Sequence, residues 1–193
     1  MKRTWLRNWL CFILVFFIHQ NVAAQVSYLS PRQEVLTGLG LSRIHDKGNY
    51  NLIPLFWDLN FDLKNIGQDR GIHTPGIFDF VWEPQVAYVF TPNSNAEVAT
   101  NFFLKFGFLP FTSRWQPYFK LGVGTIFLTE HIHGQSTQFN FSESAGLGFY
   151  YFLNPKTTLT LEYRFRHLSN AAIKSPNGGV NTNFFLVGIS MRF

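Results

Sequence analysis

The feature that most constrains the fold is an alternation of apolar and polar residues, which recurs in segments of strand length along most of the chain. Successive side chains of a β-strand point to opposite faces of the sheet, so each such segment has one apolar and one polar face. In the segment 50–63 the pattern is clear: Leu55, Trp57, Leu59, Phe61 and Leu63 alternate with Asp58, Asn60 and Asp62. The alternation predicts a chain built mainly of strands that keep one face in an apolar environment.

Eight such segments follow one another, and they are about as long as a membrane-crossing strand, roughly 9 to 14 residues. Their polar faces carry glycines and charges of both signs, as the narrow interior of a small barrel requires. Aromatic residues make up 18% of the chain, with 23 phenylalanines, and charged residues only 14%. We expect an all-β fold, an eight-stranded antiparallel transmembrane β-barrel, with strands at 34–43, 50–63, 77–90, 96–108, 115–128, 139–152, 159–169 and 181–193.

Two further features agree with this barrel. The stretch 64–76 contains Gly67, Gly71, Pro75 and Gly76, which predicts a loop. The terminal Phe193 follows alternating apolar residues, a pattern typical of the last strand of outer-membrane barrels. The alternative is a soluble eight-stranded barrel of the lipocalin type, with an apolar interior and a polar exterior. Alternation alone leaves both open, and the glycines and paired charges of the polar faces favour the membrane barrel.

The first 24 residues have the features of a secretory signal peptide. Three basic residues precede an apolar run at 9–18, and a small-residue cleavage site follows at 22–24. The run of about ten residues is too short to cross a bilayer as a helix. We therefore expect a signal peptide at 1–24 and an outer-membrane β-barrel at 25–193, with an uncleaved membrane anchor as the alternative.

Charge and cysteine content limit the partners. Removal of Lys2, Arg3 and Arg7 with the leader lowers the basic residues from 16 to 13 against 11 acidic ones, which leaves a net charge of +2. The single cysteine, Cys11, lies inside the leader. We expect no nucleic-acid partner and no disulfide in the mature protein.

The stretch 162–181 carries the residues best suited to chemistry. His167 and Ser169 lie two residues apart, so they share one face of a strand, and a histidine beside a serine is the minimum for a base-activated nucleophile. With an even number of strands and both termini periplasmic, this strand runs outward. The pair is then expected at its extracellular end, on the lipid-facing side, where a polar pair without function is the alternative.

Several fragments resemble a known family. The run His167-Leu168-Ser169-Asn170-Ala171, followed by Pro176-Asn177-Gly178, is similar to the C-terminal signature of the lipid A 3-O-deacylases, the PagL-like acyloxyacyl hydrolases. The supporting fragments, within 116–193, are Gln116-Pro117-Tyr118, Gly122-Val123-Gly124, Asn140-Phe141 and Gly146-Leu147-Gly148.

The resemblance implies an outer-membrane barrel that hydrolyses the ester-linked acyl chain at the 3-position of lipid A. It implies Ser169 as the nucleophile, His167 as the general base and Asn170 as an oxyanion contributor. The expected partners are lipid A or lipopolysaccharide and outer-membrane lipids, and a homodimer is left open. No cofactor is expected.

One position departs from the family pattern. Reference members have a glutamate twelve residues after the serine, where this chain has Asn181. An asparagine can orient the imidazole, but it supplies no negative charge to an imidazolium. The alternative function is accordingly a non-catalytic structural or adhesive barrel with a degenerate triad. Acyl transfer to another lipid is a third alternative, on which the sequence is silent.

Strand pairing suggests a substitute carboxylate. A symmetric turn at 153–157 pairs Phe152 with Thr158 and places Glu143 opposite His167, with about 5 Å between Cβ atoms. A symmetric loop at 170–180 places Asn181 opposite Ser169 and Asn183 opposite His167. Our hypothesis is that Glu143, alone or with Asn181, orients His167. A register slip of one residue would move Glu143 away and leave it without a role.

Other polar residues have simpler interpretations. Lys174 is a candidate contact for a lipid A phosphate, with a solvated loop lysine as the alternative. His131 and His133 lie two residues apart but lack further ligands nearby, so no metal site is expected. The charges of Glu162, Arg164 and Arg166 predict an ion-pair network inside the barrel, because charges there need partners.

Overall fold

The computed structural model describes residues 32–44, 48–110, 114–132, 134–154 and 156–191. The predicted signal peptide, His133 and the terminal Phe193 lie outside these residues. None of the helices in the described part of the chain is long and apolar enough to cross a membrane.

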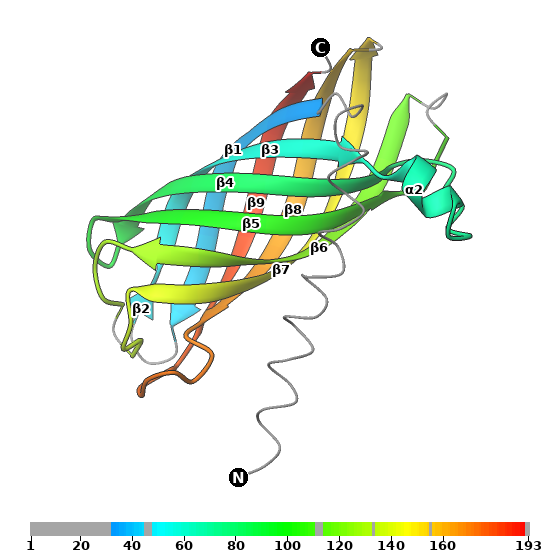
Figure 1. Cartoon of the computed structure of the whole chain (residues 1–193). Helices are drawn as coiled ribbons and strands as arrows, with labels where there is room; N and C mark the ends of the chain where they lie inside the picture. The colour runs from blue at the N-terminus through cyan, green and yellow to red at the C-terminus, as the bar shows by residue number, and fades with distance from the viewer. Residues whose placement is uncertain (1–31, 45–47, 111–113, 133, 155, 192–193) are drawn as a thin grey trace, which may run out of the picture. The chain divides into compact units, whose positions relative to one another are not determined.

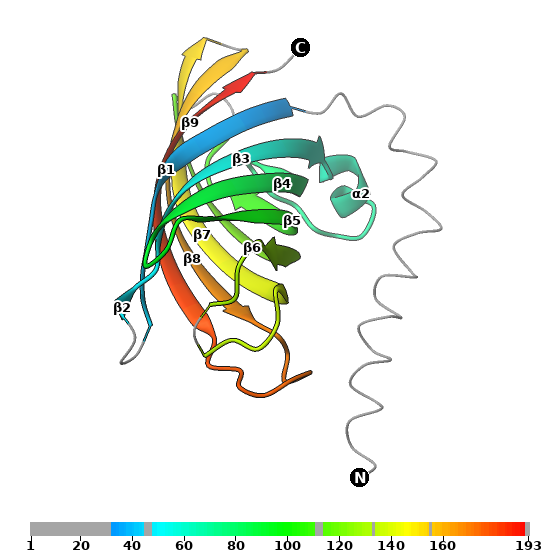
Figure 2. The same cartoon turned by 90° about the vertical axis from the view of Figure 1, so that its left-hand side faces the viewer.

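Eight long strands form a closed antiparallel barrel (Figures 1 and 2). Each strand pairs with the next along the chain, and β1 also pairs with β9, which closes the sheet. A short strand, β2 (Gly48–Asn49), pairs only with the end of β1. The eight strands are β1 (Arg32–Ile44), β3 (Asn51–Asp62), β4 (Phe78–Thr91), β5 (Asn95–Gly107), β6 (Trp115–Leu128), β7 (Phe139–Asn154), β8 (Thr157–Ser169) and β9 (Val180–Met191).

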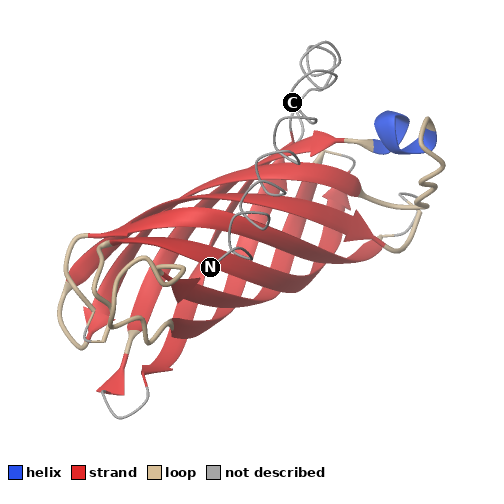
Figure 3. Ribbon diagram, turned by 60° about the horizontal axis from the view of Figure 1, so that its bottom comes forward, coloured by secondary structure: helices blue, strands red, loops and turns tan. Residues whose placement is uncertain are grey.

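The predicted eight-stranded antiparallel barrel is confirmed, and each predicted segment overlaps one observed strand. The connection 64–76 differs from the prediction, because it contains a short helix, α2 (Lys64–Gln68), drawn in blue in Figure 3. Asp62 Oδ1 accepts the Lys64 N–H at 2.8 Å, and the Gly67 N–H donates to the Leu63 carbonyl at 2.8 Å. Glycines predicted a loop here, but local hydrogen bonds close one helical turn before Gly71, which has a positive φ of 77°.

Apolar side chains cover the outside of the barrel and polar side chains fill much of its inside. Val123 is 61% exposed and Leu147 is 62% exposed, whereas Glu83 and Lys120 are fully buried. A soluble barrel would have the opposite arrangement, so that alternative is wrong. An apolar outer belt around a polar interior is the arrangement of a transmembrane barrel.

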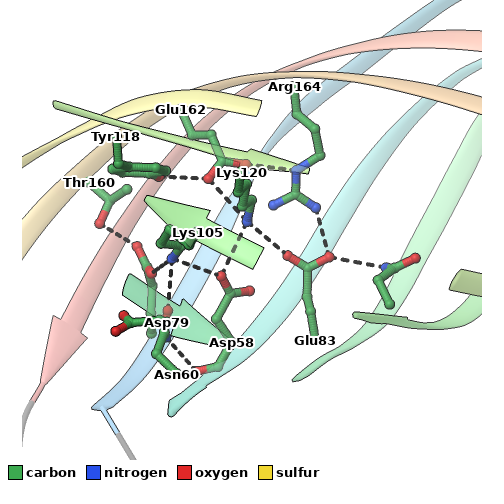
Figure 4. A network of polar contacts seen from close by, with 12 residues as sticks. Asp58, Asn60, Asp79, Glu83, Lys105, Tyr118, Lys120, Thr160, Glu162 and Arg164 are labelled. Atoms are coloured by element: carbon green, nitrogen blue, oxygen red, sulfur yellow. Dashed lines mark hydrogen bonds and ion pairs between the residues drawn. The ribbon is translucent and has the colours of Figure 1, made fainter. Parts of the chain in front are cut away.

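The charged interior side chains neutralise one another (Figure 4). Lys120 Nζ lies 3.2 Å from both Asp58 Oδ2 and Glu83 Oε2 and 3.1 Å from Glu162 Oε2. Arg164 donates to Glu83 and Glu162, at 2.7 Å in each case. Because buried charges are tolerated only with partners, this network accounts for charged residues at the centre of a small barrel.

Arg166 extends the network toward the rim where β8 ends. It donates to both carboxylate oxygens of Glu97, at 2.8 and 3.0 Å. The predicted ion-pair network of Glu162, Arg164 and Arg166 is confirmed. Its side chains fill the interior, as expected for eight strands.

β8 ends at the rim of the barrel that carries β2, which is the end opposite α2 in Figure 1. An apolar cluster fills the barrel between the ion-pair network and this rim. Leu168 belongs to this cluster and is fully buried. Its pairing partner Val180 is also buried, at 2% exposure. Alternation along β8 then turns His167 and Ser169 outward. The buried Leu168 anchors the strand end between these two polar residues.

Candidate active site

His167 and Ser169 lie together on the outer face at the end of β8, and both are half-buried. Ser169 Oγ accepts the Ala171 N–H at 3.5 Å. Within the described residues, no hydrogen bond joins Ser169 to His167. The structure therefore brings the predicted pair to one rim of the barrel, without a hydrogen bond between the two side chains. Catalytic hydrogen bonds are often long before substrate binds.

Asn181 contacts the histidine directly. His167 and Asn181 are paired across β8 and β9, and His167 Nδ1 lies 2.6 Å from Asn181 Oδ1. An amide oxygen only accepts hydrogen bonds, so this contact favours the tautomer with the proton on Nδ1 and a lone pair on Nε2. That tautomer is the one that can take a proton from a neighbouring hydroxyl.

The predicted register between β8 and β9 was wrong by two residues. Asn181 lies opposite His167 rather than Ser169, and Asn183 lies opposite Phe165, where it accepts a hydrogen bond from Tyr163 Oη at 2.6 Å. The connection is not symmetric about its predicted centre, because β9 already begins at Val180. A shift of two residues preserves the face, so Asn181 still points outward.

The register predicted between β7 and β8 is confirmed. Phe152 pairs with Thr158, and Glu143 pairs with His167. Glu143 is exposed, and its side chain makes no hydrogen bond to any described residue. Its role in orienting the imidazole stays a prediction.

Asn170 is fully buried and belongs to the loop rather than facing Ser169. Its Nδ2 donates to Ser136 Oγ at 3.1 Å and to the Lys174 carbonyl at 2.7 Å, and its backbone N–H donates to Asn177 Oδ1 at 3.0 Å. Both amide hydrogens are engaged, so an oxyanion role for this side chain requires one contact to break. Lys174 contributes its carbonyl here, and its side chain is exposed.

These contacts join two connections at the rim, 129–138 and 170–179. The buried Gln135 is central to them, and sequence reasoning missed it. A glutamine in a polar loop carries no signal of burial, and two of its three partners, Asn177 and Gly179, lie more than 40 residues away. Among the described residues, no group of three or more histidine, cysteine, aspartate or glutamate side chains is arranged to hold a metal ion.

Apolar residues lie on the neighbouring strand and in the connection that follows Ser169. Ser169 pairs with Phe141, whose ring lies 5.5 Å from that of Phe139 in an edge-to-face contact. Ile173, in the connection that follows, is 69% exposed. The half-buried Ser169 thus lies on the outer face of the barrel with apolar residues around it.

A closed eight-stranded barrel with an apolar outer belt and a charged interior defines the protein as a small outer-membrane β-barrel. At one rim, on the outward face, it carries Ser169 and a histidine whose Nδ1 contacts the amide oxygen of Asn181. The chain belongs to the lipid A 3-O-deacylase (PagL) family, because the model of that family matches residues 53–190.

Two solved structures share the fold. The crystal structure of the outer membrane enzyme PagL is 14% identical, with a TM-score of 0.65 over 80% of this chain and 97% of that one. The crystal structure of Neisserial surface protein A (NspA) is 12% identical, with a TM-score of 0.64 over 85% of this chain and 97% of that one. A comparison with curated proteins found no match.

Proposed function

We propose that this protein is a lipid A 3-O-deacylase, which removes an ester-linked 3-hydroxyacyl chain from lipid A by a serine-hydrolase mechanism. The observation that carries the proposal is the 2.6 Å contact between His167 Nδ1 and Asn181 Oδ1, on the face that also holds Ser169. It supports a base-competent imidazole beside a nucleophile. The family match over residues 53–190 supplies the substrate class.

In the proposed reaction, His167 Nε2 takes the Ser169 proton as Oγ attacks the acyl carbonyl. The imidazolium then protonates the departing 3-oxygen of lipid A and leaves an acyl-serine. Water, activated by the same imidazole, attacks this ester and releases the fatty acid. The Ala171 N–H, 3.5 Å from Ser169 Oγ, is a backbone donor that could contribute to the oxyanion without disturbing Asn170.

Substrate approach follows from the outward position of the pair. Lipid A occupies the outer leaflet, so an ester can reach a serine on the lipid-facing surface without leaving the membrane. Phe141 pairs with Ser169, and Phe139 on the same strand and Ile173 in the following connection add exposed apolar surface. Lys174 is exposed in that connection as a contact for a lipid A phosphate. This arrangement requires the rim with Ser169 to face the cell exterior.

Two residues are proposed to orient the imidazole. Asn181 contacts Nδ1, and Glu143 is its opposite neighbour on β7. Glu143 is the only carboxylate among the strand partners of His167, so it is the proposed source of negative charge near an imidazolium. Normal hydrolysis by a Glu143→Ala variant would remove Glu143 from the mechanism and leave Asn181 as the orienting residue.

A structural or adhesive barrel without activity is the second candidate function. Asn181 in place of a glutamate favours it, because the amide that contacts His167 supplies no charge to balance the imidazolium. The fold likeness to Neisserial surface protein A supports the fold alone and leaves the choice of function to experiment.

Mass spectrometry of lipid A from expressing cells tests the proposal. Expression of the wild-type protein should remove one 3-hydroxyacyl chain, and Ser169→Ala and His167→Ala should abolish the loss. Unchanged lipid A with wild-type protein folded in the outer membrane would favour the structural barrel.

A further inference from the structure

Gln135 lies in the connection between β6 and β7, outside the strand that carries His167 and Ser169, and it is only 4% exposed. All hydrogen-bonding groups of its side chain are engaged. Nε2 donates to Asn140 Oδ1 at 2.6 Å and to Asn177 Oδ1 at 3.0 Å, and Oε1 accepts the Gly179 N–H at 3.3 Å. A carboxamide, with two donors and an acceptor, is the side chain that satisfies these three partners.

One of these contacts leads to the base. Gly179 has a positive φ of 66°, and a Cβ at this position would lie 2.8 Å from Cε1 and 3.4 Å from Nε2 of His167. The backbone of Gly179 therefore lies directly against the imidazole, beside the nitrogen that is proposed to take the proton. Through the Gly179 N–H, Gln135 fixes the surface against which the imidazole rests.

A second contact leads to the nucleophile. Asn177 Oδ1, which accepts from Gln135, also accepts the backbone N–H of Asn170, the residue directly after Ser169. On its other side, Gln135 is bonded to Asn140, whose position is itself fixed. Asn140 is fully buried, and its Nδ2 donates to the carbonyls of Thr137 at 3.0 Å and Gln138 at 3.1 Å. Gln135 thus ties the chain after Ser169 to the start of β7.

Main-chain bonds hold the two connections together independently of this side chain. Ser136 N–H donates to the Pro176 carbonyl at 3.0 Å, and Gly178 N–H donates to the Gly134 carbonyl at 2.9 Å. Loss of the Gln135 side chain should therefore leave the connections paired and the barrel folded. We expect loss of this side chain to alter the positions of His167 and Ser169 instead.

We propose that Gln135 is a positioning residue of the deacylase site, which holds Gly179 against His167 and the chain behind Ser169 from a separate loop. This inference rests on the proposed function for its effect on turnover. The geometric part, the placement of the imidazole, is independent of whether the protein turns over lipid A.

Two variants and a matched control test the role. Gln135→Ala removes all three hydrogen bonds, and Gln135→Glu keeps the shape but turns an oxygen toward the amide oxygens of Asn140 and Asn177. Gln138→Ala is the control, because Gln138 lies in the same connection and its Nε2 donates to the Thr129 carbonyl at 3.0 Å. Misplacement of reacting groups costs up to about 100-fold in rate. Both Gln135 variants should lose about 10- to 100-fold in kcat at unchanged KM, with Gln138→Ala at the wild-type rate.

A spectroscopic measurement separates this inference from the proposed function. In protein labelled with ¹⁵N-histidine and held in detergent micelles, the His167 imidazole signals, identified by their absence from His167→Gln, should move in Gln135→Ala and stay in Gln138→Ala. If the wild-type protein has no activity but the His167 signals still move in Gln135→Ala, the deacylase proposal is overturned and the positioning role is retained.

An unmoved His167 signal and unchanged kcat in folded Gln135→Ala would overturn the inference, and so would a change confined to KM. If Gln135→Ala does not fold, Gln135→Met, which keeps the side-chain volume, is measured in the same way, and the same results support or overturn the positioning role.

Discussion

Replacement of Asn181 by aspartate should increase the rate of deacylation. The substitution preserves the length of the side chain, so an oxygen can stay near His167 Nδ1, where Asn181 Oδ1 now lies at 2.6 Å. An amide can turn either its oxygen or its nitrogen toward the ring, whereas a carboxylate presents only oxygen. Aspartate would therefore select the base-competent tautomer and also place a negative charge beside the imidazolium.

The size of the effect follows from the geometry. A carboxylate in contact with Nδ1 places the two charges about 4 Å apart, which corresponds to about 4 kcal/mol at an effective dielectric constant near 20. Asn181 is exposed at the rim, so solvent screening reduces this to about 1 to 2 kcal/mol. Since 1.36 kcal/mol corresponds to a tenfold change in rate, kcat should rise about tenfold.

The assay measures 3-hydroxy fatty acid released from purified lipid A in detergent micelles, by liquid chromatography and mass spectrometry. Asn183→Asp is the matched control, because it adds the same charge on the same strand and face, but opposite Phe165. The Ser169→Ala/Asn181→Asp double variant reports any release that bypasses the serine. Circular dichroism confirms the barrel in each variant.

A rate for folded Asn181→Asp at or below that of the wild type would refute this reasoning. An equal increase in Asn183→Asp would also refute it, because the charge would then act at long range rather than on the imidazole.

Three further predictions concern the loop, the interior and the outer surface. Gly179→Ala should lower kcat at least about tenfold, because a Cβ would press on the imidazole; Gly71→Ala, with a positive φ but nothing within 4 Å, should not. Arg166→Ala should lower the free energy of unfolding by about 3 to 5 kcal/mol in urea titrations in detergent, because it leaves the buried Glu97 carboxylate without its cation; an unchanged midpoint would contradict this. Leu147→Arg should cost about 2 to 4 kcal/mol in lipid vesicles, because the charge faces hydrocarbon near the middle of β7; a neutral result would contradict the membrane belt.

Local pattern was sufficient to predict the barrel. The alternation along each strand depends only on neighbouring residues, so strand positions, the face of each side chain and the interior ion pairs of Arg164 and Arg166 followed from the sequence. The pairing of Glu143 with His167 was also predictable, because the turn between β7 and β8 is short. Short turns leave few registers.

The site was less predictable where long connections intervene. The ten residues between Ser169 and Val180 include Ala171 and Ala172, both with positive φ, which no residue pattern indicated. This path moves β9 by two residues relative to a symmetric loop and places Asn181, rather than Asn183, against His167. The register between β8 and β9 therefore depends on the folded connection.

The sequence by itself determined a membrane-embedded barrel of eight strands, with a histidine and a serine two residues apart on the outward face of one strand. Periodicity and spacing are local properties, and local sterics translate them into structure. Only the tertiary structure decided which asparagine contacts the imidazole, that Asn170 bonds to both connections at the rim, and that Gln135 links these two connections. Such contacts join residues distant along the chain, and hydrogen bonds between them form only after the barrel brings its connections to the same rim.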